Sequence, residues 1–157
     1  MQSSRRDKLI LDSDHDPTRP TAHLSDPTVC PDCGATYIEG RWTWRHGPVE
    51  AQRRRCSACE RIRDDYPAGF VSIHGDFVRA NRDELVRIAR NTETREKRAH
   101  PINRIMRIEE SGDGLRILTT ETHLAQSIGR ALHAAYKGDL DFDFQEDIVR
   151  VTWRRED

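Results

Sequence analysis

The sequence has few apolar residues and no long hydrophobic run. Hydrophobic residues make up 35% of its 157 positions and charged residues make up 34%, which is poor in apolar residues for a globular protein. No stretch approaches the roughly 20 consecutive apolar residues that a membrane-spanning helix needs. We therefore expect one ordinary domain or two small ones, with no large single core and no membrane segment.

Several signals of enzymes and of secretion are also missing. No Gly-rich loop is followed by Lys and Ser or Thr, which excludes a P-loop nucleotide site, and no serine stands in a nucleophile-elbow context. Residues 12–16 begin like a calcium loop, but Pro17 stands where that loop needs Gly and His23 where it needs Glu. Residues 1–16 are polar, so we expect no secretory signal and a cytoplasmic protein. We assemble no nucleophile–base pair and predict no enzymatic activity and no catalytic residues.

The chain has only four cysteines, and they form two pairs with the same internal spacing. Cys30 and Cys33 make one pair, Cys56 and Cys59 make the other, and 22 residues lie between the pairs. A two-residue gap lets two sulfurs meet one ion, and two such turns complete a tetrahedral zinc site. Reduced thiols in the cytosol favour a metal over disulfides. We predict one structural Zn²⁺ at these cysteines; a redox dithiol, disulfides and an iron–sulfur cluster are the alternatives.

Arginines cluster around the cysteine pairs, although the net charge of the whole chain is only −1. Residues 41–63 hold seven arginines and two acidic residues. Four thiolates on one zinc carry a net charge of about −2, so some of these arginines are expected to neutralise the site. Arginine is also suited to phosphate and to stacking on bases, so the others are candidates for RNA binding. The predicted RNA-binding residues are Arg41, Arg45, Arg53, Arg54, Arg55, Arg61 and Arg63.

Three regions are predicted along the chain, which together give an α+β fold. Residues 1–28 read as a flexible arm, residues 29–80 as a zinc ribbon with four cysteine ligands, and residues 81–157 as a small C-terminal α+β domain. In the ribbon we expect a strand pair bent at Gly40, with Trp42 and Trp44 on its core side. We also expect a hairpin-like turn at residues 74–76, between short strands at 70–73 and 77–78.

The C-terminal region is predicted to run helix, strand, strand, helix, strand, strand. Its first helix spans residues 81–99, with Asn81 and Glu84 spaced as a capping box. In the second helix, Leu124, Ile128, Leu132 and Ala135 form an apolar stripe. The acidic residues from Asp139 to Asp147 alternate with apolar ones, as on a solvated strand face. The remaining expected elements are strands at 102–109 and 115–120, a helix at 122–137, and strands at 140–144 and 148–153.

Several stretches of the sequence together resemble a family of small bacterial zinc-ribbon proteins. The resemblance extends over about residues 28–155. This family is in turn distantly similar to the zinc-binding region of the adaptor, named after nonsense-mediated decay, that exports the large ribosomal subunit. That region has further metal-binding cysteine pairs, whereas this chain has one complete set. The stretches are 30–35, 40–44 and 59–69, then 91–96, 100–101 and 104–106, and finally 119–125, 128–129 and 135–138.

The resemblance implies that the four cysteines are the metal ligands and that the partner is RNA or the ribosome, in stress or dormancy. Our leading hypothesis is therefore a non-enzymatic protein that binds RNA through the arginines of the ribbon. The segment 95–100 and the turn 119–123 of the C-terminal domain would then make further contacts. The alternative is a protein–protein adaptor or transcription regulator with a purely structural zinc, in which the acidic strand and the N-terminal arm bind the partner.

Overall fold

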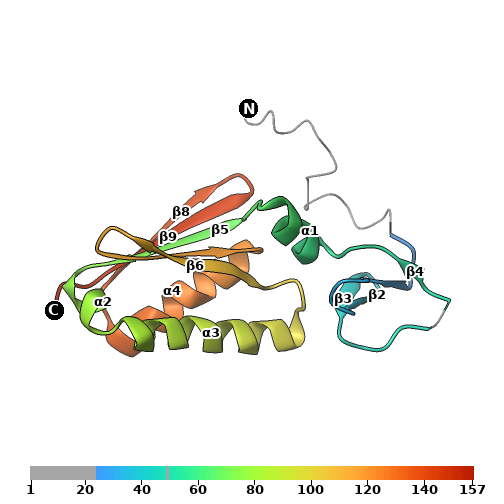
Figure 1. The fold of residues 1–157 in the computed structure, drawn as a ribbon, viewed down its shortest axis with the longest axis horizontal. Helices are drawn as coiled ribbons and strands as arrows, with labels where there is room; N and C mark the ends of the chain where they lie inside the picture. Colours follow the sequence, from blue (N-terminus) through green and yellow to red (C-terminus); the bar gives the residue numbers. More distant parts are fainter. Residues whose placement is uncertain (1–23, 49) are drawn as a thin grey trace. The chain divides into compact units, whose positions relative to one another are not determined.

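The computed structural model describes residues 24–48 and 50–157, which form two units that meet between Tyr66 and Pro67 (Figure 1). Each unit is built on a mixed sheet, and the described residues include four helices. The predicted α+β class is confirmed. The predicted arm lies outside the described residues up to position 23, as do residues 12–16. None of the described helices is long and apolar enough to cross a membrane.

The first unit contains a small four-stranded sheet and one helix. The sheet has the order β3-β2-β1-β4, in which β1 and β4 are parallel and the other neighbours are antiparallel. The predicted bend at Gly40 separates β2 from β3, and its φ of 84° suits glycine. Its elements are β1 (Thr28–Val29), β2 (Thr36–Ile38), β3 (Arg41–Thr43), β4 (Gln52–Arg53) and α1 (Ser57–Asp64).

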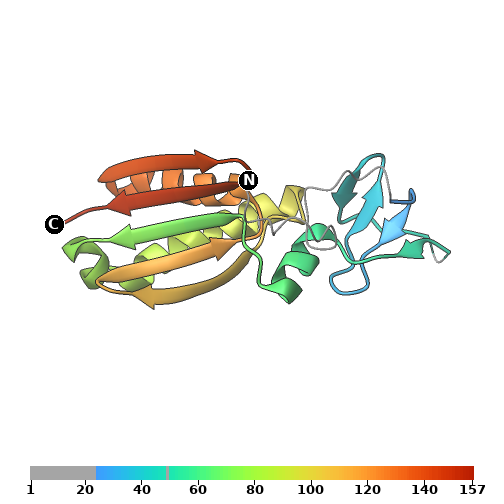
Figure 2. The same cartoon turned by 90° about the horizontal axis from the view of Figure 1, so that it is seen from above.

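The second unit is a five-stranded sheet with the order β6-β7-β5-β9-β8. Its central strand β5 is antiparallel to β7 and parallel to β9. Helices α3 and α4 lie on one face of this sheet (Figure 2). Its elements are β5 (Gly69–His74), α2 (Asp76–Ala80), α3 (Arg82–Ala99), β6 (Ile105–Ser111), β7 (Gly114–Thr119), α4 (Thr122–Tyr136), β8 (Asp139–Gln145) and β9 (Ile148–Arg154).

The core of the second unit lies between the sheet and the two long helices. Alternate residues of β5 and β9 face it, including Val71 and Val151, and Trp153 is fully buried at its end. Leu124, Ile128 and Leu132 of α4 fill it, as the three- and four-residue spacing predicted, but Ala135 is exposed. This unit therefore has an extensive apolar core of its own.

Two local predictions in this unit are wrong. The expected second strand of a hairpin at 77–78 belongs to helix α2, which begins directly after Gly75. The expected capping box at Asn81 does not form, because the Asn81 side-chain amide donates to the Phe77 carbonyl oxygen at 2.9 Å. Glu84 is also engaged elsewhere, since it accepts hydrogen bonds from Arg87 and from the Tyr136 hydroxyl.

The predicted boundary between the two regions also differs from the structure. Residues 67–80, which the sequence predicts as part of the ribbon, belong to the second unit, because β5 pairs along its length with β7 and β9 and forms the centre of the second sheet. The boundary after Tyr66 follows from these long-range pairings. At the other end, Thr28 was placed in the arm but is buried and begins β1.

Candidate metal centre

The first cysteine pair lies in a tight turn that connects β1 to β2. The backbone N–H of Cys30 donates to the Ala35 carbonyl at 2.8 Å, and the N–H of Gly34 donates to the Cys30 carbonyl at 3.0 Å. Gly34 has a φ of 85°, a left-handed conformation that glycine adopts without steric cost. The sharp turn predicted after the second ligand is therefore present, and it brings both sulfurs to one side.

The second cysteine pair opens helix α1. Cys56 is the N-cap residue, and its sulfur accepts a hydrogen bond from the backbone N–H of Cys59 at 3.4 Å. The N-terminus of a helix carries a partial positive charge, which favours the thiolate form of cysteines placed there. The two pairs thus reach the same place from different local structures, one from a turn and one from a helix start.

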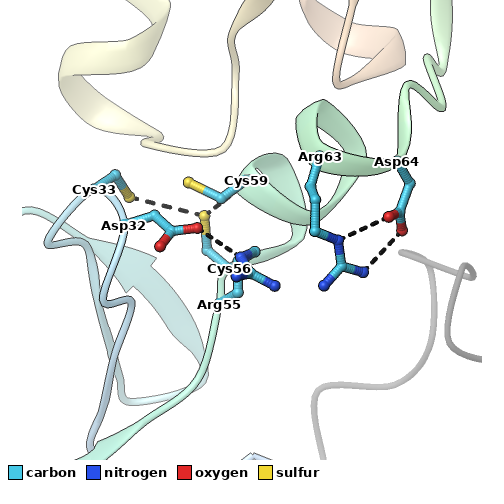
Figure 3. A network of polar contacts seen from close by, with 7 residues as sticks. All are labelled: Asp32, Cys33, Arg55, Cys56, Cys59, Arg63 and Asp64. Atoms are coloured by element: carbon cyan, nitrogen blue, oxygen red, sulfur yellow. Dashed lines mark hydrogen bonds and ion pairs between the residues drawn. The ribbon is translucent and has the colours of Figure 1, made fainter.

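The four sulfurs lie together at the end of the small sheet. All four are within 4.8 Å of one another, and the sulfurs of Cys33 and Cys56 are 3.8 Å apart (Figure 3). Sulfurs bound to one zinc at about 2.3 Å in a tetrahedron are separated by about 3.8 Å, so the spacing fits a single ion. All four cysteines are free of disulfides, and only Cys33 is partly exposed. The arrangement is therefore a candidate metal site with four sulfur ligands.

The electrostatics of the cluster favour a bound cation. Burial raises the pKa of the Cys30 thiol, but hydrogen bonds from the backbone of Cys56, Cys33 and Asp32 outweigh it, so this pKa lies below its usual value. At Cys56, burial and the neighbouring thiolates outweigh the hydrogen bond from the Cys59 N–H at the helix start, and they raise the pKa of this thiol well above its usual value. Four thiolates cannot share this space without a positive charge, and a metal ion bound by deprotonated sulfurs supplies that charge.

One ion pair joins the two cysteine-containing segments. The guanidinium Nε of Arg55 donates to a carboxylate oxygen of Asp32 at 2.5 Å (Figure 3). Asp32 lies between the first two cysteines and Arg55 directly precedes the third. Hydrogen bonding to Asp32 raises the pKa of Arg55. This contact is not among the sequence predictions, although an acidic residue inside one cysteine pair and an arginine beside the other were a signal for it.

We predict that Arg55→Gln weakens metal binding by about two- to fivefold. The expected effect is small because partly exposed ion pairs contribute little free energy. The change removes the link between the two segments and leaves all four sulfurs in place. Competition with a zinc chelator of known affinity measures the effect. Arg54→Gln is the matched control, since Arg54 is exposed and adjacent in sequence. Equal affinities of the two variants would show that the ion pair does not support the site.

Three of the seven predicted RNA-binding arginines donate side-chain hydrogen bonds to other residues of the protein. Arg55 pairs with Asp32, and Arg63 pairs with its neighbour Asp64 at 2.7 Å (Figure 3). Arg61 is only 4% exposed. It donates to the Tyr66 carbonyl at 2.7 Å, and its guanidinium lies over the Tyr66 ring. Arg61 therefore holds the end of α1 in place. The prediction that Arg61 is an RNA-binding residue is wrong, because its side chain is buried.

The other four arginines are exposed near the two edges of the small sheet. Arg41 lies on β3, and Arg53 lies on β4 at the opposite edge. The strand register places both on the same face of the sheet, because residues paired across strands share a face. Arg54 follows β4, and Arg45 follows β3 and approaches Glu39 at 3.8 Å. The structure thus brings the cysteines into one cluster but distributes the arginines around the sheet.

The two tryptophans of this unit differ in burial. Trp42 is buried and packs against the Tyr37 ring with a centroid distance of 5.6 Å. Trp44 lies just past the end of β3 and is 42% exposed. The prediction that the tryptophans cover the thin core is confirmed for Trp42 only, because β3 ends before Trp44.

A search against models of known protein families found no match, and neither did searches of curated proteins and of solved structures. The resemblance to bacterial zinc-ribbon proteins therefore stays a prediction from the sequence. The candidate metal centre rests on the geometry of the four cysteines.

Proposed function

We propose that the first unit is a zinc ribbon that holds one structural Zn²⁺ and binds RNA, on the ribosome or free, through its exposed arginines. The gathering of four sulfurs within 4.8 Å carries the zinc part of the proposal. A site with four protein ligands has no open position for a substrate. The metal then has a structural role, and the surface of the unit does the binding.

The RNA part of the proposal is supported by the charge and exposure of four arginines. They carry planar guanidinium groups, which suit phosphate and base stacking alike, and Trp44, next to Arg45 in the chain, is partly exposed. Contact with about four phosphates of single-stranded RNA gives a log–log slope of affinity against salt near −3. The residues are Arg41, Arg45, Arg53 and Arg54.

We predict that changing these four arginines to glutamine weakens RNA binding strongly, because the variant loses the charges that release counterions from the phosphates. The salt slope should fall from about −3 toward zero, while the zinc content stays unchanged. Fluorescence anisotropy with a labelled single-stranded RNA, titrated over salt concentration, measures both effects. Co-sedimentation with ribosomes tests the same variant against the larger partner.

A matched control removes four exposed arginines from the second unit. The quadruple variant of Arg79, Arg82, Arg90 and Arg130 to glutamine changes the net charge equally, lies outside the segments 95–100 and 119–123, and is expected to bind RNA as the unchanged protein does. Equal losses of RNA affinity in both variants would show that net charge alone, and not the ribbon surface, determines RNA binding. Full RNA binding without the four ribbon arginines would refute the proposal and favour the adaptor function.

A further inference from the structure

Strand β8 lies at the edge of the five-stranded sheet. It is seven residues long and pairs with β9 alone among the described strands. An edge strand presents a row of unpaired backbone N–H and C=O groups, to which another strand can bind. Figure 2 shows β8 as the outermost strand, on the side away from β6.

The two faces of β8 carry different chemistry. Asp139, Asp141 and Asp143 alternate along one face, and all three are exposed. Across from them on β9 stand Arg154, Thr152 and Arg150, so basic residues on an added strand would continue a row of alternating charge across this face. On the other face Leu140 and Phe142 pack against the core beside Gly129 of α4.

Beyond Phe142, the apolar face of β8 continues into solvent. Phe144 stacks on Phe142 with a centroid distance of 6.1 Å, and it is 64% exposed. The edge strand therefore offers a row of carboxylates on one side and an exposed aromatic ring on the other.

The acidic row alone has a simple explanation. Charges along an edge strand prevent pairing with a second copy of the same strand, because like charges opposite each other are unfavourable. A protective role needs the carboxylates but not Phe144, whose exposed ring extends the apolar face of Phe142 and gives a partner side chain a surface to pack on. The two features together exclude another acidic strand and match a strand that carries basic residues on one face and apolar residues on the other.

We propose that the free edge of β8 binds an extended segment of a protein partner in which Lys or Arg alternates with apolar residues. The segment adds to the sheet as a strand beside β8. Its basic side chains lie opposite the three aspartates, and an apolar side chain packs on Phe144. Backbone hydrogen bonds give the affinity, and the alternating side chains give the specificity. The carboxylates repel phosphate, so this edge is distinct from the proposed RNA surface.

Fluorescence anisotropy of labelled peptides on the zinc-loaded full chain tests this proposal. The probe is a peptide of about eight residues in which arginine and valine alternate. An isomer of the same composition, with all arginines before all valines, is expected to bind about tenfold more weakly because it cannot match both faces of β8. Methylation of alternate backbone nitrogens of the probe removes the donors for β8 and is expected to abolish binding.

Variants of the protein make the test specific to β8. Asp139→Asn with Asp141→Asn is expected to weaken binding of the alternating probe about fivefold, and Phe144→Ser is expected to weaken it as well. The matched control, Asp113→Asn with Asp157→Asn, removes two exposed carboxylates elsewhere and should change affinity by less than about twofold. No binding of the alternating probe, equal binding of its isomer, or undiminished binding after backbone methylation would overturn the proposal.

Discussion

Removal of the metal with a strong chelator should unfold the first unit and leave the second unit folded. The first unit has few large buried side chains beyond Tyr37 and Trp42, so we expect its fold to depend on the metal that we propose at the four cysteines. Binding of structural zinc contributes an apparent free energy of about 10–16 kcal/mol, more than the stability of most small domains. The second unit has a core of fifteen buried residues and no cysteine.

Tryptophan fluorescence separates the two units. Trp42 and Trp44 lie in the first unit, and Trp153 is the third tryptophan of the chain. In a Trp153→Phe variant the emission reports the first unit alone, and chelation should shift it to that of exposed indole. Cys56→Ser should produce the same spectrum without chelator. Native-like emission and full dichroism from protein shown to be free of metal would contradict the proposed role of the site.

Replacement of Trp153 by alanine should destabilise the second unit by about 3–5 kcal/mol. The Trp153 ring is fully buried and packs against Phe77, and its indole N–H donates to the Lys137 carbonyl at 2.6 Å. The substitution opens a large cavity in the core and leaves that carbonyl without its donor. Denaturant unfolding followed by far-ultraviolet dichroism measures the loss of stability.

The same variant tests whether the two units are independent. Its zinc content and its response to chelator should equal those of the unchanged protein, because no cysteine lies in the second unit. Trp44→Ala is the matched control: it removes a partly exposed tryptophan from the first unit and should leave unfolding of the second unit unchanged. A loss of zinc in Trp153→Ala would contradict the independence of the two units, and a loss of stability below about 1 kcal/mol would contradict the expected cost of the cavity.

The sequence predicted those elements whose pattern is local. The stripe of Leu124, Ile128 and Leu132 located α4, and the alternation along β8 and β9 located both strands. Residues 77–78 were misassigned because two adjacent apolar residues fit a strand or a helix equally well. The sheet to which β5 belongs was also not predictable from local sequence, since only its long-range pairing with β7 and β9 puts it in the second sheet.

In the candidate site, too, the local features were predictable from the sequence and the features that depend on packing were not. The two-residue gap within each cysteine pair brings its two sulfurs together, whether in a turn or at a helix start, so the gathering of all four sulfurs was predictable from the sequence. The exposure of the arginines was not predictable from the sequence, because it depends on how the segments that carry them pack, as α1 does for Arg61 and Arg63. Arg61 points into the protein and contacts Tyr66, whereas Arg54 points out. Binding to RNA or the ribosome, a cytoplasmic location and a role in stress stay predictions.

Elemental analysis of untagged protein, purified without chelators, tests most directly whether Cys30, Cys33, Cys56 and Cys59 hold a metal. It should be combined with titration of accessible thiols before and after addition of chelator. We predict about one zinc per chain, with the four thiols protected until the metal is removed. Protein with no stoichiometric zinc, or with its cysteines in disulfides, would contradict the assignment.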